Sequence, residues 1–112
     1  MNNFGFVFKQ AQKLQDDIAK AQSELAEMKV TGSAGGGMVE VIANCRQQIL
    51  SIKIEPAIKE SGDLEMLEDL VLAATNQALQ LAQQQASEHM SKLGGGLLSM
   101  LPDGIKIPGI NS

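Results

Sequence analysis

Apolar residues recur at alternating steps of four and three along VFKQAQKLQDDIAKAQSELAEM, residues 7–28. The positions of this apolar seam are Val7, Ala11, Leu14, Ile18, Ala21, Leu25 and Met28. A period of 3.5 residues is typical of a helix that packs along another helix, whereas a wider apolar stripe is typical of a helix on a globular core. The seam therefore predicts a helix of about 25 residues that packs along a partner helix, from the same chain or from a second copy. An ordinary amphipathic helix is the alternative.

A glycine-rich stretch, VTGSAGGG (residues 30–37), should end this helix, because Gly costs about 1 kcal/mol in a helix interior. It predicts a flexible turn or an irregular edge strand. Apolar residues then alternate with polar ones in MVEVIAN and ILSIKIE, which the polar CRQQ separates. The alternating positions are Val39, Val41 and Ala43, then Leu50, Ile52 and Ile54. We expect an antiparallel hairpin with one buried face, ended by Pro56, which cannot donate to a ladder.

A second long helix is predicted from Asp63 to Leu93, after the connection AIKESG. Asp63 is a good N-cap, and Glu65 and Glu68 lie in the first two turns, where the helix dipole is positive. The apolar face consists of Leu64, Leu67, Val71, Ala74, Ala78 and Leu81. Gly94 supplies a left-handed cap. The chain therefore divides into a folded domain, 1–93, and a Gly- and Pro-rich flexible tail, 94–112.

Composition narrows the classes of function. A chain of 112 residues is one small domain, for which oligomerisation is a natural way to gain core. Three Phe and no Tyr or Trp argue against a reader that stacks single-stranded bases on aromatic rings. The lone Cys45 cannot form an internal disulfide, which favours the cytoplasm. The chain has neither a signal-peptide pattern nor an apolar run of about 18 residues, so we expect no membrane partner.

Candidate catalytic and metal-binding groups are few. Glu65, Glu68 and Asp69 share a helix face, but a carboxylate metal site in a helical bundle also needs a nearby His. His89 is roughly 30 Å away along the same predicted helix. Nothing in the sequence brings Cys45 and His89 together as nucleophile and base, and GSAGGG lacks phosphate-binding spacings. We expect no catalytic residue, metal or cofactor.

Charge is unevenly distributed along the chain, whose net charge is −4. Residues 60–92 contain six acids and one Lys, whereas the first fifteen residues contain only Lys9 and Lys13 as charged side chains. These two lysines, with Lys20, fall on the outer face of the first helix, away from the seam. A dimer through the seam would present each lysine twice, which suffices for weak, salt-dependent phosphate binding. A merely solvated surface is the alternative.

Three blocks in order, VTGSAGGGMVEV, LSIKIEPA and LEMLEDLVLAATNQAL, with KQAQKLQ before them and LPDGIKIPG after them, carry a family resemblance. The chain resembles the YbaB/EbfC family of nucleoid-associated proteins. The resemblance implies an α+β fold of order α-β-β-β-α, with a small antiparallel sheet flanked by two long helices in a tweezer-like homodimer. It also implies that the stretch around Val30 is a first short strand.

The function that the resemblance implies is binding of double-stranded DNA with low sequence specificity, by bending or bridging. Nucleoid organisation, DNA protection and regulation of gene expression would follow, in the cytoplasm and nucleoid. The implied DNA-binding residues are Lys9, Lys13, Lys20, Lys92 and Lys106. The expected dimer interface consists of Leu14, Ile18, Leu25, Leu64, Leu67 and Val71.

An alternative hypothesis makes the protein an interaction adaptor. In it, the acidic second helix and the apolar tail dock a DNA replication or repair protein. The acids of DLEMLEDL (residues 63–70) place negative charge in one region, so under the leading hypothesis DNA lies away from them, towards the lysines of the first helix.

Overall fold

A computed structural model describes the backbone of residues 3–99 and the side chains of residues 4–92. Its elements are α1 (Asn3–Glu27), β1 (Lys29–Ala34), β2 (Val39–Asn44), β3 (Ile49–Ile54), α2 (Pro56–Ser61) and α3 (Leu64–Ser99). The strands form one antiparallel sheet in the order β1-β2-β3. The α+β class and the α-β-β-β-α order are confirmed, and the short helix α2 is an addition to them.

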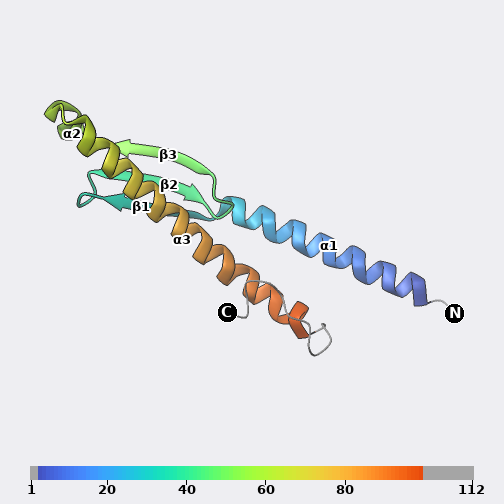
Figure 1. The fold of residues 1–112 in the computed structure, drawn as a ribbon. Coiled ribbons are helices and arrows are strands. Elements are labelled where there is room, and N and C mark those ends of the chain that lie inside the picture. The colour runs from blue at the N-terminus through green and yellow to red at the C-terminus, as the bar shows by residue number, and fades with distance from the viewer. Residues whose placement is uncertain (1–2, 100–112) are drawn as a thin grey trace.

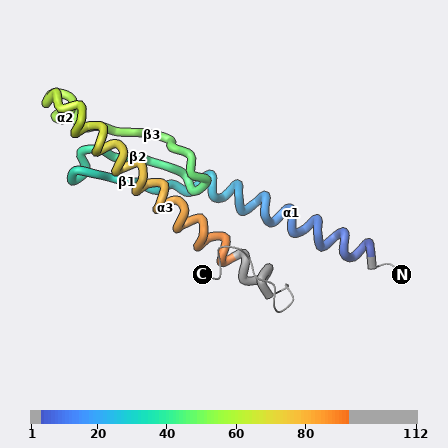
Figure 2. Tube along the Cα trace, viewed as in Figure 1, coloured from blue at the N-terminus to red at the C-terminus, as the bar shows by residue number. Residues whose placement is uncertain are grey.

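The molecule is elongated, with principal extents of 74, 28 and 17 Å. Helix α3 lies along one face of the sheet, and α1 and α3 leave the same end of the sheet as two diverging arms (Figure 1). The tube drawing shows the same separation of the two helices (Figure 2). The free end of α1 therefore lies far from the sheet.

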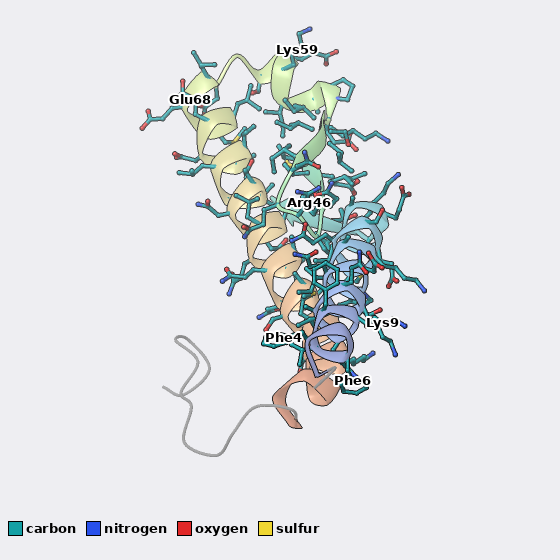
Figure 3. The ribbon with its side chains drawn as sticks, turned by 90° about the vertical axis from the view of Figure 1, so that its right-hand side faces the viewer. Phe4, Phe6, Lys9, Arg46, Lys59 and Glu68 are labelled. Carbon is teal, nitrogen blue, oxygen red and sulfur yellow. The ribbon has the colours of Figure 1, made fainter. Side chains whose placement is uncertain are left out.

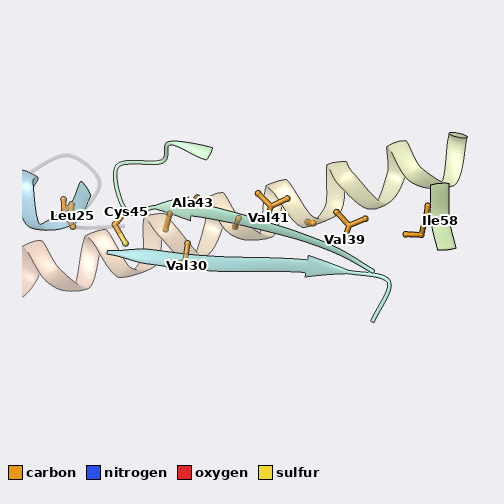
Figure 4. Packing of buried hydrophobic residues seen from close by; sticks show 10 residues of the cluster. Leu25, Val30, Val39, Val41, Ala43, Cys45 and Ile58 are labelled. Atoms are coloured by element: carbon orange, nitrogen blue, oxygen red, sulfur yellow. The ribbon is translucent and has the colours of Figure 1, made fainter. Parts of the chain in front are cut away.

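The core lies between α3 and the strands β1 and β2 (Figure 4). Ala74, Ala78 and Ala82 are completely buried, and their spacing of four residues places them on one face of α3. Because alanine carries only a methyl group, the helix axis can lie close to the sheet. The approach is tight at Gly32 of β1, where an added Cβ would overlap backbone atoms of Ala74 and Ala78.

The end of α1 is fixed to the end of β2. The backbone N–H of Cys45 lies 3.0 Å from the carbonyl oxygen of Leu25 and 2.9 Å from that of Met28, and donates to both. The end of a helix leaves its last carbonyl groups short of intrahelical donors, and Cys45 supplies one to Leu25, whose carbonyl also accepts the Met28 N–H at 3.3 Å. Ala21 and Leu25 are buried, so the last two turns of α1 belong to the core.

Strand β1 is a regular six-residue strand within the glycine-rich stretch. All six residues pair with β2, and the Ser33 N–H also donates to Gln77 Oε1 of α3 at 2.6 Å. The turn that follows contains Gly35, Gly36 and Gly37, all with positive φ. The turn was thus predicted correctly, and the first strand implied by the family resemblance is confirmed, whereas irregular pairing was wrong.

The β2–β3 hairpin is confirmed, but the expected burial of β3 is wrong. Val39, Val41 and Ala43 of β2 are completely buried, whereas every residue of β3 is exposed. A helix about 10 Å wide covers about two strands spaced 4.8 Å apart, and α3 lies over β1 and β2. In addition, a register shift pairs Ala43 with Ile49, so Leu50 does not continue the alternation with Ile52 and Ile54.

The segment before the second long helix and the end of that helix both differ from the prediction. Pro56 does end β3, but it also begins α2, because Pro is favoured in the first turn of a helix. Helix α3 runs through Gly94 to Ser99, so the predicted left-handed cap at Gly94 is wrong. Once packing has fixed the helix from Met66 to Met90, continuing it is cooperative, and a cost of about 1 kcal/mol per glycine does not end it. Residues 100–112 of the predicted tail lie outside the described residues.

Candidate nucleic-acid interface

The outer part of α1 is an arm that packs against the rest of the described chain only at its base. All residues from Phe4 to Lys20 are exposed, and burial begins at Ala21. At 1.5 Å per residue this exposed arm is roughly 25 Å long. Lys9, Lys13 and Lys20 all lie on it, so the structure brings these three predicted residues onto one element.

Helix geometry separates the lysines of the arm from its apolar seam. At 3.6 residues per turn, Lys9, Lys13 and Lys20 fall within about 40° of one another around the α1 axis. Leu14 and Ile18 of the seam lie roughly opposite them. The arm thus has a lysine face, formed by the three lysines, and an apolar face.

The two arms meet at their base, where a side chain of α3 approaches a side chain of α1. His89 Nε2 of α3 lies 2.9 Å from Glu24 Oε2 of α1, without hydrogen-bond geometry. His89 and Glu24 are both half-buried. This contact joins α1 to α3 near the sheet and leaves both outer arms free to meet a ligand.

The remaining predicted lysines lie elsewhere. Lys92 is exposed near the outer end of α3, on the second arm. Lys106 lies outside the described residues. The structure therefore places Lys92 on a different arm from Lys9, Lys13 and Lys20.

The six residues expected at a dimer interface have different environments. Leu14 and Ile18 are each 36% exposed on the arm, and Leu64 is 65% exposed at the start of α3. Leu67 and Val71 are half-buried at the margin of the core. Leu25 is only 7% exposed, because it packs within its own chain. Five of the six thus keep surface for a partner, and Leu25 does not.

The sequence pattern missed an apolar surface on β3. Ile49, Leu50, Ile52 and Ile54 are all 38–49% exposed. Alternation placed Ile52 and Ile54 on the same side as the buried residues of β2, and their register with Val41 and Val39 agrees. No feature of the sequence pattern indicates that α3 leaves this strand uncovered.

The acidic start of α3 lies at the end of the molecule opposite the lysine arm. Asp63 Oδ1 accepts the Met66 N–H at 3.0 Å, which confirms the predicted N-cap. Figure 3 shows Glu68 at one end of the molecule and Lys9 towards the other. The charge asymmetry along the sequence is therefore also an asymmetry in space.

Cys45 is buried at the end of β2, with its Sγ 4.0 Å from Gln85 Oε1. Desolvation by burial raises the pKa of the Cys45 thiol, so the thiolate is depleted at neutral pH. A catalytic cysteine requires the opposite shift. The geometry therefore makes Cys45 a core residue.

Cys45 should consequently react at least about tenfold more slowly with a disulfide reagent in buffer than in denaturing guanidinium chloride, because its sulfur is reached only on opening of the fold. The rate at which the reagent releases its own thiolate measures the reactivity of Cys45. Ser23→Cys, at an exposed position of α1, supplies a fast-reacting thiol in the same chain. Equal rates at Cys45 in buffer and denaturant would contradict its burial.

Neither a membrane span nor a metal cluster occurs among the described residues. No helix in residues 3–99 is long and apolar enough to cross a bilayer. In the same part of the chain, no three His, Cys, Asp or Glu side chains converge on a point where they could hold a metal ion. The features left to support function are the lysine face, the apolar face of the arm and the surface of β3.

A small sheet that carries two helical arms, one of them with an exposed lysine face, defines a candidate nucleic-acid-binding protein. A model of the YbaB/EbfC DNA-binding family matches residues 1–97. A nucleoid-associated protein of Clostridium novyi (strain NT) is 50% identical over 95 residues, which are 85% of this chain and 83% of that protein. One of Thermoanaerobacter sp. (strain X514) is 47% identical over 95 residues, 85% and 86% of the two chains. The chain belongs to the YbaB/EbfC DNA-binding family.

The likeness extends over nearly the whole chain in some relatives. A nucleoid-associated protein of Pelotomaculum thermopropionicum is 44% identical over 108 residues, which are 96% of this chain and 95% of that one. Among solved structures, the crystal structure of an uncharacterized protein from Helicobacter pylori is similar, with a TM-score of 0.61. It is 17% identical and covers 75% of this chain and 98% of that chain, so it supports the fold alone.

Proposed function

We propose that this protein binds double-stranded DNA as a homodimer with low sequence specificity and bends or bridges it. Such binding would serve nucleoid organisation, DNA protection and regulation of gene expression, in the cytoplasm and nucleoid, without catalysis. The observation that carries the proposal is the lysine face of the exposed α1 arm in a chain of a DNA-binding family.

Low sequence specificity follows from the chemistry of that arm. Lysine is a point charge that binds phosphate groups, and phosphate contacts position a protein on DNA without reading its sequence. The lysine face carries Lys9, Lys13 and Lys20 but no Arg, the side chain most often used for bidentate contacts to guanine. Lys92 on the second arm, and Lys106, are proposed as further phosphate contacts.

A homodimer is proposed because the described chain leaves one apolar surface of the sheet open. Ile52 and Ile54 of β3 stand beside the core face but are not covered by α3. Leu67 of α3 lines a surface hollow together with Ile54, Pro56 and Lys59, so the expected interface residue and β3 form one continuous apolar surface. The opposite face of β3 carries Ser51 and Lys53, which suit water. A second copy that covers the apolar side would gain the hydrophobic free energy that one chain forgoes.

Ile52→Asp should convert the dimer to a monomer without unfolding the chain. Ile52 is 49% exposed in one chain, so the charge costs little there, but its burial against a second copy would cost several kcal/mol. Solution mass by light scattering and helix content by circular dichroism measure the two effects. Ser51→Asp, on the other face of the same strand, is the matched control and should stay dimeric. A dimer that Ile52→Asp leaves intact would contradict this interface.

The proposed function is tested by a mobility shift on random-sequence duplex DNA, titrated with salt, beside a measurement of solution mass. We expect a shift at low salt that weakens steeply as salt rises, because each phosphate contact releases counterions, and the mass of a dimer. Absence of a shift at low salt would overturn the DNA-binding proposal. If a protein were then recovered by pull-down and lost on deletion of residues 94–112, the adaptor hypothesis would replace it.

A further inference from the structure

All three aromatic side chains of the chain stand on the first two turns of α1, at the tip of the arm. Phe4 is 87% exposed, and Phe6 and Phe8 are each 67% exposed. None of the described residues covers them. Exposed apolar clusters of this kind mark contact surfaces on soluble proteins.

Helix geometry assigns the three rings to two different faces. Phe4 and Phe8 are one turn apart and continue the apolar seam outward, beside Val7. Phe6 lies about 160° around the axis from Phe4, and within about 60° of both Lys9 and Lys13. In Figure 3, Phe6 and Lys9 project from the same side of α1 and Phe4 from the opposite side. Phe6 therefore belongs to the lysine face.

The surroundings of Phe6 are cationic. Lys9 and Lys13 are the only charged side chains in the first fifteen residues, and the first acids, Asp16 and Asp17, occur about three turns further along the helix. Gly5 beside Phe6 has open space around it, since an added Cβ would meet no atom within 4 Å. The tip thus presents one ring flanked by two lysines on a narrow, unobstructed support.

We infer that Phe6 inserts as a wedge between base pairs from the minor groove while Lys9 and Lys13 hold the neighbouring phosphates. This inference rests on the proposed function and gives it a contact mode. Proteins that bend DNA often insert an apolar side chain such as Phe, which unstacks one step and kinks the duplex. Flexible pyrimidine–purine steps deform most easily, so a weak preference for them should result. Three aromatic rings are too few for a protein that stacks successive bases on its side chains, but one inserted ring per arm is enough to kink the duplex.

Two other occupants suit the arm less well than DNA. An anionic membrane binds helices whose apolar residues form one broad face opposite their lysines, whereas Phe6 stands among the lysines. A second copy that packs on the apolar seam would cover Phe4 and Phe8 and leave Phe6 outside. The charge around Phe6 is complementary to phosphate, which favours the duplex.

The test compares Phe6→Ala with Phe8→Ala, a matched control of equal exposure on the other face of the tip. DNA affinity is measured against salt, and bending by energy transfer between dyes at the two duplex ends. Phe6→Ala should lower affinity about fivefold or more, since aromatic stacking on a base is lost. The loss should be equal at every salt concentration, because no cation is removed, and bending should decrease. Phe8→Ala should leave the bend unchanged, and Phe6→Trp should restore it.

The outcomes separate this inference from the function on which it rests. A wild-type protein that shifts no duplex at low salt would overturn both. Wild-type binding and bending that persist unchanged in Phe6→Ala would overturn the wedge alone. Loss of dimer mass in Phe6→Ala would assign the ring to self-association instead. Binding to phosphatidylserine vesicles that Phe6→Ala abolishes, with DNA bending intact, would assign it to a membrane.

Discussion

The double variant Lys9→Glu, Lys13→Glu should bind duplex DNA at least about a hundredfold more weakly than the wild-type protein at low salt. In a dimer it removes four cations and adds four carboxylates at the tips of the arms. Each lost phosphate contact removes about 0.9 from the slope of log affinity against log salt, so the slope should fall by about 4 if all four lysines make contacts. A salt-titrated mobility shift or fluorescence anisotropy measures both quantities.

The matched control is Lys29→Glu, Lys53→Glu, which changes the net charge by the same amount. Both lysines are exposed on the sheet, Lys29 at the start of β1 and Lys53 on the face of β3 opposite Ile52 and Ile54, and neither lies on the arm. The control should lose much less affinity, because charges more than a Debye length from the DNA, about 10 Å at moderate salt, are screened. Equal losses in the two variants would show that net charge, and not the lysine face, governs binding.

Gly32→Ala should destabilise the folded chain by about 3 kcal/mol or more. The added Cβ would overlap the backbone of α3 at Ala74 and Ala78, and backbone atoms cannot swing aside as a side chain does. Either β1 or α3 must shift, which opens the contact that holds the sheet to the long helix covering it. For a domain of this size the melting temperature should fall by at least about 12 °C. Thermal and urea unfolding followed by circular dichroism measure the effect.

Gly5→Ala is the control for the change of Gly to Ala. An added Cβ at Gly5 meets no atom within 4 Å, and Gly5 lies within α1, where Ala is favoured over Gly by about 1 kcal/mol. Its unfolding midpoint should stay at that of the wild-type protein or rise. If Gly32→Ala unfolded at the same midpoint as Gly5→Ala, the close approach of β1 to α3 would be contradicted.

The elements were predictable wherever one local signal decided them. The alternating Val39, Val41 and Ala43 predicted a buried strand face, and Asp63 predicted the start of α3, because periodicity and capping depend only on neighbouring residues. The first strand was predictable only from the family resemblance. The strand β1 pairs with β2, which follows a turn. A glycine is needed at Gly32 because α3, more than 40 residues away in the sequence, packs against that position.

The candidate site was predictable in part for the same reason. That Lys9, Lys13 and Lys20 share a face of α1 follows from their spacing. That the arm is exposed from Phe4 to Lys20 does not, because the seam on the same helix equally predicts packing against another helix. Leu25 shows the converse case, since it continues the seam but is buried in its own chain.

Local order, namely two long helices, a hairpin, a helix cap and the segregation of charge, follows from the residue pattern, because each depends on interactions within a few residues. Coverage does not. A single helix is wide enough for two strands, so the choice of β1 and β2 over β3 left Ile52 and Ile54 exposed, and the length of α1 beyond the sheet left its lysines and rings in solvent. Contacts between segments that are distant in the sequence decide both features. These two features create the surfaces on which the proposed function depends.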